Sequence, residues 1–139
     1  PAEAERPTGQ EAPGKNETLL VGEDEPAVRE LARIILQTHG YRVLEAGSGV
    51  EALSIWGQRS DGIDLVFTDM VMPQGMSGRN LAERLLAQKP DQRIVYTSGY
   101  SPSRAGAGFN SLEGLEFLPK PYEARQLLRT VRECLDGKS

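Results

Sequence analysis

Residues 63–73 read IDLVFTDMVMP, an apolar run that ends at a carboxylate. Apart from one aspartate, residues 63–67 have the character of a strand buried on both faces. Asp69 follows where that strand would end, and the carboxyl ends of strands are where parallel sheets collect ligands and chemistry. Aspartate is also a common turn former, and Pro73 marks a loop. The stretch alone leaves both interpretations of Asp69 open.

Short apolar segments alternate along the whole chain with amphipathic helical segments. The predicted strands are residues 18–22, 41–46, 63–68, 93–98 and 115–119. The predicted helices begin at Pro26, Ser48, Ser77 and Tyr122 and end near Gly40, Arg59, Lys89 and Gly137. This alternation predicts an α/β fold with a doubly wound, five-stranded parallel sheet and helices on both faces. In the first helix, the expected core stripe is Val28, Leu31, Ala32 and Ile35.

Two segments depart from this rhythm. Residues 1–17 are rich in Pro, Gly, Glu and Ala and lack large aliphatic side chains, so we expect a disordered linker before a domain spanning 18–137. Between the fourth and fifth strands, four glycines and Pro102 predict a fourth helix that is short or disordered.

Composition narrows the class of partner. A chain of 139 residues is long enough for one domain with a real core. The net charge of −4 and the lack of a dense Lys/Arg run argue against direct binding of nucleic acid. Cys134 is the single cysteine, so no internal disulfide can form. No apolar stretch approaches the roughly 18 residues of a membrane helix. We therefore expect a cytoplasmic domain without membrane contact.

Polar side chains follow four of the predicted strands: Glu23 and Asp24, Asp69, Ser98, and Lys120. The carboxyl ends of parallel strands share one edge of the sheet, so these groups should converge. Two carboxylates about 4 Å apart repel by about 4 kcal/mol at an effective dielectric constant near 20. A divalent cation would relieve the repulsion, and oxygen ligands suit Mg²⁺. Such a site could transfer a phosphoryl group, with an Asp69 oxygen as the nucleophile.

Four motifs in this order resemble the receiver domain of two-component response regulators, over about residues 17–136. They are VGEDEP, FTDMVMP, the SG after the fourth strand, and FLPKP. The spacings agree with the family, at 45 positions from Asp24 to Asp69 and 22 from Ser98 to Lys120. The resemblance implies a flavodoxin-like sheet with strand order 2-1-3-4-5.

The resemblance also implies roles for individual residues. Asp69 matches the phosphoacceptor, and Glu23 and Asp24 match the acidic pair. Mg²⁺ would be held by Asp69, by one or both residues of the acidic pair, and by the backbone carbonyl of Val71. Lys120 matches the lysine of the family.

Further implied features concern switching and lifetime. Ser98 matches the switch hydroxyl and Phe117 the aromatic switch position, and the Lys120–Pro121 peptide would be cis. Val71 and Tyr100 flank the acceptor without offering a group that orients water. We therefore expect the phosphoryl group to last longer than seconds.

His39, at the end of the first helix, is the only histidine, so the phosphoryl donor must be external. The resemblance implies a histidine kinase or a histidine phosphotransfer domain as partner. The leading linker and the SGY…FLPKP pattern favour the C-terminal receiver of a hybrid sensor histidine kinase, in the cytoplasmic portion of a chain that could be anchored in a membrane. The alternative is a stand-alone single-domain response regulator. In both cases the domain would catalyse its own phosphorylation and dephosphorylation without being a turnover enzyme.

Two other classes of protein fit the sequence less well than a receiver does. An aspartyl-phosphate phosphatase usually carries a second acid two residues after the nucleophile, where this chain has Val71. A nucleotide- or flavin-binding module would need a glycine-rich loop after the first strand. That place holds GEDEP, whose carboxylates repel phosphate. The receiver is the better interpretation.

Overall fold

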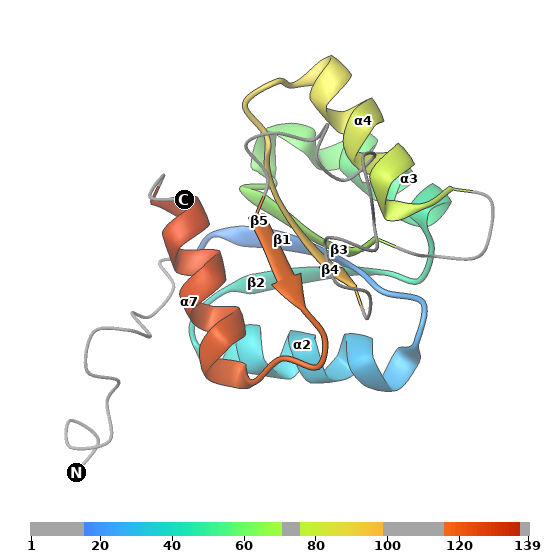
Figure 1. The fold of residues 1–139 in the computed structure, drawn as a ribbon. Helices are drawn as coiled ribbons and strands as arrows, with labels where there is room; N and C mark the ends of the chain where they lie inside the picture. The colour runs from blue at the N-terminus through green and yellow to red at the C-terminus, as the bar shows by residue number, and fades with distance from the viewer. Residues whose placement is uncertain (1–15, 71–75, 99–115, 137–139) are drawn as a thin grey trace, which may run out of the picture.

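The computed structural model describes residues 16–70, 76–98 and 116–136 (Figure 1). Its strands are β1 (Thr18–Gly22), β2 (Arg42–Ala46), β3 (Leu65–Asp69), β4 (Arg93–Ser98) and β5 (Glu116–Pro119). Every neighbouring pair in this sheet is parallel, and the order is β2-β1-β3-β4-β5. The predicted doubly wound fold and its strand order are confirmed.

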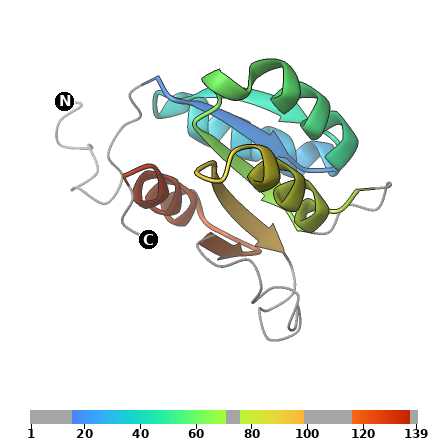
Figure 2. The same cartoon turned by 90° about the horizontal axis from the view of Figure 1, so that it is seen from above.

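Helices cover both faces of the sheet (Figures 1 and 2). They are α2 (Pro26–Thr38), α3 (Gly49–Arg59), α4 (Gly78–Gln88) and α7 (Ala124–Leu135), and a 3₁₀ turn, η1 (Ser60–Gly62), precedes β3. α2 and α7 lie on one face, and α3 and α4 lie on the other. In the described parts of the chain, every helix is too short or too polar to cross a bilayer. The predicted weak fourth helix falls within residues 99–115, outside the described residues.

The sheet separates two hydrophobic clusters. Alternate residues of a strand point to opposite faces, so Leu19 packs toward α2 and α7 while Leu20 packs toward α3 and α4. On the α3/α4 side, the indole nitrogen of buried Trp56 donates to the Gln92 side-chain oxygen at 2.9 Å. The central strand β3 is buried along its whole length. The strand that ends at Asp69 is therefore the best-enclosed element of the sheet.

The expected core stripe of α2 was wrong at one position. Leu31 is 52% exposed, whereas Ala32 and Leu36 are buried. Val28 and Ile35 are half-buried. The buried stripe is centred on the 32/36 pair, and because successive residues are about 100° apart around a helix, Leu31 turns outward. α2 thus presents an apolar surface to solvent that the sequence pattern had assigned to the core.

Side-chain caps set the starts of the helices on the α3/α4 face. The Ser48 hydroxyl accepts from the Glu51 amide at 3.1 Å, so Ser48 is the N-cap of α3, at the predicted helix start. The Ser77 hydroxyl accepts from the Asn80 amide at 3.0 Å within a capping box. These caps satisfy amides at the helix start that would otherwise lack partners. They fix the points at which the chain leaves the carboxyl edge of the sheet.

The chain enters the domain close to α7. Of the predicted linker, residues 1–17, only Asn16 and Glu17 are described. The Glu17 carboxylate lies 2.8 Å from Arg132 Nη2, and Asn16 donates its amide to the Gly40 carbonyl. These two residues of the predicted linker are therefore bonded to the folded domain.

Gly78 allows α4 to start against the end of β3, which generates a prediction. A Cβ at this position would overlap the backbone of Asp69 and Met70. We expect Gly78→Ala to lower the free energy of unfolding by about 1–3 kcal/mol in urea denaturation, because the backbone must move. The control is Gly57→Ala in α3, where a Cβ meets nothing within 4 Å. This substitution should raise the free energy of unfolding by up to about 1 kcal/mol. A Gly78→Ala protein as stable as the wild type would contradict this packing.

Candidate functional site

Side chains from three strand ends meet at the carboxyl edge of the sheet. β1 and β3 are paired with Gly22 opposite Thr68, so Glu23 and Asp69 come next, side by side. Lys120 directly follows β5. Its Nζ lies 3.0 Å from Glu23 Oε1 and 3.1 Å from Asp69 Oδ2. One ammonium therefore bridges two carboxylates.

Asp24 completes an acidic cluster. One carboxylate oxygen from each of Glu23, Asp24 and Asp69 lies within 4.8 Å of the others. Glu23 and Asp69 are buried, and Asp24 is half-buried. With all three ionised beside a single lysine, the cluster carries excess negative charge. The donor set consists only of hard oxygen atoms, so these residues fit a divalent cation such as Mg²⁺.

The electrostatics of the cluster follow from burial and charge. Burial raises the pKa of Glu23 above its ordinary value, the nearby Asp69 charge adds to the rise, and the Lys120 hydrogen bond opposes it. For Lys120, burial acts to lower the pKa, but the bonds to Glu23 and Asp69 outweigh it and raise the pKa overall. Lys120 is therefore charged at neutral pH. The ionised form of the Glu23 carboxyl is less favourable here than it would be in water.

The loop after β1 is tied down at several points. The Glu23 side chain accepts from the Glu25 amide at 3.2 Å as well as from Lys120. Its carbonyl accepts from Arg29 Nη1 at 2.8 Å. Glu25 is the N-cap residue of α2 and makes no side-chain cap bond. Glu23 thus satisfies an amide at the helix start and faces the cluster at once.

The structure places some of the other predicted site features and leaves others outside the described residues. Ser98 ends β4 with its backbone opposite Pro119, one residue before Lys120, and its side chain lies outside the described residues. Val71 and Tyr100 also lie outside them. Phe117 is half-buried and packs on the α3/α4 side. The Lys120–Pro121 peptide is cis, as the resemblance implied.

Two residues beside the cluster, Tyr122 and Arg29, were not predicted as part of the site. Tyr122 lies edge-to-face with Phe67 at 5.8 Å between ring centroids. Burial, followed by the charge of Glu23, raises the pKa of Tyr122 to about 12, so its phenol is neutral at physiological pH. Arg29 binds the Glu23 carbonyl from inside α2. Tyr122 adjoins the FLPKP motif, which was a usable signal, but nothing in the spacing of Arg29 distinguishes it from a surface arginine.

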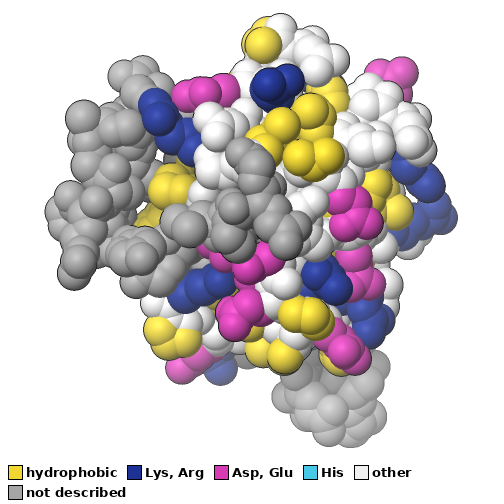
Figure 3. Space-filling model, turned by 90° about the vertical axis from the view of Figure 1, so that its right-hand side faces the viewer, with side chains coloured by type: hydrophobic (Ala, Val, Ile, Leu, Met, Phe, Trp, Pro, Cys, Tyr) yellow, Lys and Arg dark blue, Asp and Glu magenta, His cyan; other side chains and the backbone are white. Residues whose placement is uncertain are grey.

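The cluster opens on one face of the molecule. Figure 3 looks onto this edge of the sheet and shows acidic side chains gathered there, with Lys and Arg side chains on either side and hydrophobic side chains close by. One pocket on the described surface has a volume of about 420 Å³ and is lined by Val28, Leu31, Lys120, Pro121 and Tyr122. Lys120 belongs to both the acidic cluster and the wall of this apolar pocket.

Comparisons of sequence and of structure with known proteins agree on one family. The family model described as "Response regulator receiver domain" matches residues 19–132. The sensor kinase CckA of Brucella abortus (strain 2308) is 40% identical over 119 residues, which are 86% of this chain and 12% of that kinase. Sporulation initiation phosphotransferase F of Bacillus subtilis (strain 168) is 27% identical over 124 residues, covering 89% of this chain and 98% of that protein. The crystal structure of a receiver domain from the hybrid histidine kinase CckA aligns with a TM-score of 0.72 and 34% identity, covering 85% of this chain and 98% of that domain.

The bridging role of Lys120 can be tested through stability. Replacing Lys120 with Met leaves two buried carboxylates without their cation, which for buried pairs costs about 3–5 kcal/mol. Because the Lys120 side chain is 20% exposed, we expect a loss of about 2–3 kcal/mol in urea unfolding without divalent cations. Adding Glu23→Gln to Lys120→Met should recover part of this loss of stability. Glu83→Gln, which removes an exposed pair with Arg79, should cost less than about 1 kcal/mol. Equal losses for Lys120→Met and Glu83→Gln would contradict a buried bridge.

Proposed function

The chain belongs to the response regulator receiver family, and from this premise we propose that it is a phosphoacceptor domain of a two-component phosphorelay. In this proposal, Asp69 takes a phosphoryl group from a phosphohistidine in the presence of Mg²⁺. The observation that carries the proposal is the Lys120 bridge between Glu23 and Asp69 inside a cluster of three carboxylates.

The chain supplies a nucleophile and a fixed countercharge for this transfer. A carboxylate oxygen of Asp69 forms a bond to phosphorus while the P–N bond of the donor breaks, and its electron pair returns to the imidazole. Lys120, 3.1 Å from Asp69, is held where negative charge on the transferred oxygens would develop. Bound Mg²⁺ would neutralise charge on those oxygens and on the acidic cluster. We assign its ligands to Asp69, one or both of Glu23 and Asp24, and the Val71 carbonyl.

The proposed response to phosphorylation uses two further residues. The Ser98 hydroxyl would bind the acquired phosphoryl group, and Phe117 would change its rotamer as the end of β4 adjusts. Phe117 lies opposite Tyr96 in the β4–β5 register, within reach of that movement. Its half-buried position on the α3/α4 face leaves it room to pack either inward or outward.

A protein donor is favoured by the apolar surface beside the site. The 420 Å³ pocket shares Lys120 with the acidic cluster, and Leu31 and Ile34 of α2 are 52% and 46% exposed. Large exposed apolar side chains around a pocket mark binding sites. A small phosphodonor would not need this surface, whereas a helix that carries a phosphohistidine could bury it. Domains of this family interact with histidine kinases or phosphotransfer proteins.

Two settings for the domain remain as proposals. Similarity to the sensor kinase CckA supports a receiver within a hybrid sensor histidine kinase. The chain spans only 12% of that kinase, so the activity of the remainder does not transfer to it. The alternative is a stand-alone regulator, supported by the match along 98% of sporulation initiation phosphotransferase F. We expect a cytoplasmic domain in either setting, because histidine kinases draw on ATP there.

Phosphorylation of Asp69 is tested directly with acetyl phosphate, Mg²⁺ and intact-mass measurement. The wild type should gain one phosphoryl group, and Asp69→Asn should gain none because its amide is not a nucleophile. Chelation of Mg²⁺ should abolish labelling. The control Asp61→Asn, an exposed acid in η1, should label like the wild type. A full adduct on Asp69→Asn would show that another residue is the acceptor.

The phosphoryl adduct on the wild type should also last longer than seconds. Decay of the adduct within a second would contradict the expected lifetime.

The proposed donor surface is tested by adding charge to it. Leu31→Glu should slow transfer from a phosphorylated histidine phosphotransfer domain about tenfold, a loss of about 1.4 kcal/mol. Labelling by acetyl phosphate should be unchanged, because that donor needs no apolar contact. Val50→Glu is the matched control, since Val50 is 57% exposed but does not line the pocket. If both variants slow protein-mediated transfer equally, the pocket is not the docking surface.

A further inference from the structure

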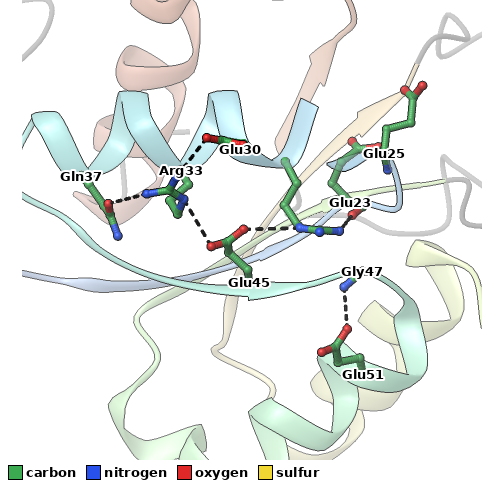
Figure 4. Close-up of polar contacts among 9 residues, drawn as sticks. Glu23, Glu25, Glu30, Arg33, Gln37, Glu45, Gly47 and Glu51 are labelled. Atoms are coloured by element: carbon green, nitrogen blue, oxygen red, sulfur yellow. Dashed lines mark hydrogen bonds and ion pairs between the residues drawn. The ribbon is translucent and has the colours of Figure 1, made fainter. Parts of the chain in front are cut away.

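Arg29 connects the edge of the sheet to the loop that carries the acidic pair. Its Nη1 donates to the Glu23 carbonyl at 2.8 Å, and its Nε lies 3.4 Å from Glu45 Oε1 on the edge strand β2. The side chain is 23% exposed. Figure 4 shows the two acidic residues that this side chain joins, Glu45 on β2 and Glu23 in the loop between β1 and α2. One guanidinium therefore joins two elements that meet at the candidate site.

The carbonyl that Arg29 binds lies between the two residues of the acidic pair. It belongs to the peptide unit between Glu23 and Asp24, and that unit is planar. A bond to its oxygen restricts the rotation of this plane, which joins the two Cα atoms that carry the acidic side chains. The amide of Glu23 is held from the other side by the Ala46 carbonyl at 3.0 Å. Contacts from β2 and α2 thus hold Glu23 on both sides, directly before Asp24.

Arg29 is itself held in place. Glu45 uses its second oxygen to bind Arg33 Nε at 3.3 Å, and Arg33 also bonds Gln37 at 3.1 Å and Glu30 at 3.5 Å (Figure 4). The carboxylate that receives Arg29 is therefore fixed by a second arginine.

Gly47 leaves space for the guanidinium. A Cβ at Gly47 would lie 3.0 Å from Arg29 Nη1, closer than side chains ordinarily tolerate. The Gly47 amide donates to Glu51 Oε1 at 2.7 Å, which fixes this turn at the start of α3. A side chain at residue 47 would therefore crowd the guanidinium and shift it slightly.

We propose that Arg29 is a positioning residue for the cation site: it holds the Glu23–Asp24 peptide in the arrangement that binds Mg²⁺. Glu45 and Gly47 serve this role by fixing the guanidinium and leaving it room. Arginine suits the role because its planar guanidinium presents several donors in a fixed geometry, here toward the Glu23 carbonyl and the Glu45 carboxylate. This inference rests on the proposed function, because it concerns Mg²⁺ binding at the same cluster.

The experiment compares Mg²⁺ affinity in Arg29→Gln and wild-type protein by isothermal titration calorimetry on the 139-residue chain. Loss of a residue that orients metal ligands typically weakens binding 10–100-fold, and we expect about tenfold here. The Mg²⁺ concentration that half-saturates acetyl phosphate labelling should rise by the same factor. The labelling rate at saturating Mg²⁺ should return close to the wild-type rate, since Asp69 and Lys120 are untouched. A residue that only stabilises the fold would lower the melting temperature without moving this Mg²⁺ dependence.

Two variants separate positioning from general charge or stability effects. Arg33→Gln removes the other arginine on Glu45 but touches no atom of Glu23, so it should weaken Mg²⁺ binding much less than Arg29→Gln does. Gly47→Ala keeps every charge and displaces the guanidinium, so it should weaken Mg²⁺ binding less than Arg29→Gln does. Unchanged Mg²⁺ affinity in Arg29→Gln, or a loss in Arg33→Gln as large as that in Arg29→Gln, would overturn this inference and leave the proposed function unaffected. A wild-type protein that binds no Mg²⁺ would overturn the proposed function and this inference together.

Discussion

Repulsion among three carboxylates is the constraint on which the rest of the structure depends. Glu23, Asp24 and Asp69 have oxygens within 4.8 Å of one another, and Lys120 is the cation bonded to two of them. Left flexible, the loop after β1 would move its acids apart into water. A site that binds a cation or a phosphoryl group must keep them close before the ligand arrives. The fold therefore has to supply rigidity at this edge, and part of its stability is offset by the resulting electrostatic strain.

That rigidity comes from contacts that have no role in chemistry. β3 is buried along its length between two hydrophobic clusters, which fixes the backbone of Asp69. Gly78 lets α4 start directly against the end of that strand. On the other side, Ala46 and Arg29 hold the amide and the carbonyl of Glu23. Glu23 and Asp69 are thus anchored by main-chain contacts in addition to the bonds that their side chains make to Lys120.

The parts of this arrangement that follow from strand order could be predicted, and the parts that depend on side-chain direction could not. Asp69 and Lys120 are far apart in sequence, but each directly follows an apolar strand, so a parallel sheet must bring them to one edge. Leu31 was assigned to the core because helical periodicity fixes spacing and not the rotation of the helix against the sheet. Arg29 and Tyr122 were missed for a related reason: their importance comes from the groups opposite them, and one sequence does not reveal those groups.

The arrangement also separates chemistry from recognition. The acidic cluster consists of hard oxygen ligands and an ammonium, which treat any phosphoryl donor alike. The neighbouring pocket is apolar, and Lys120 and Pro121 lie in its wall. A donor that buries Leu31 and Val28 would place its phosphorylated group next to Lys120, and therefore close to Asp69. Under the proposed function, selectivity among donors would then change through exposed residues of α2 while the charges of the acidic cluster and Lys120 stay constant. The outward rotation of Leu31, which the sequence pattern did not predict, is what makes this division possible.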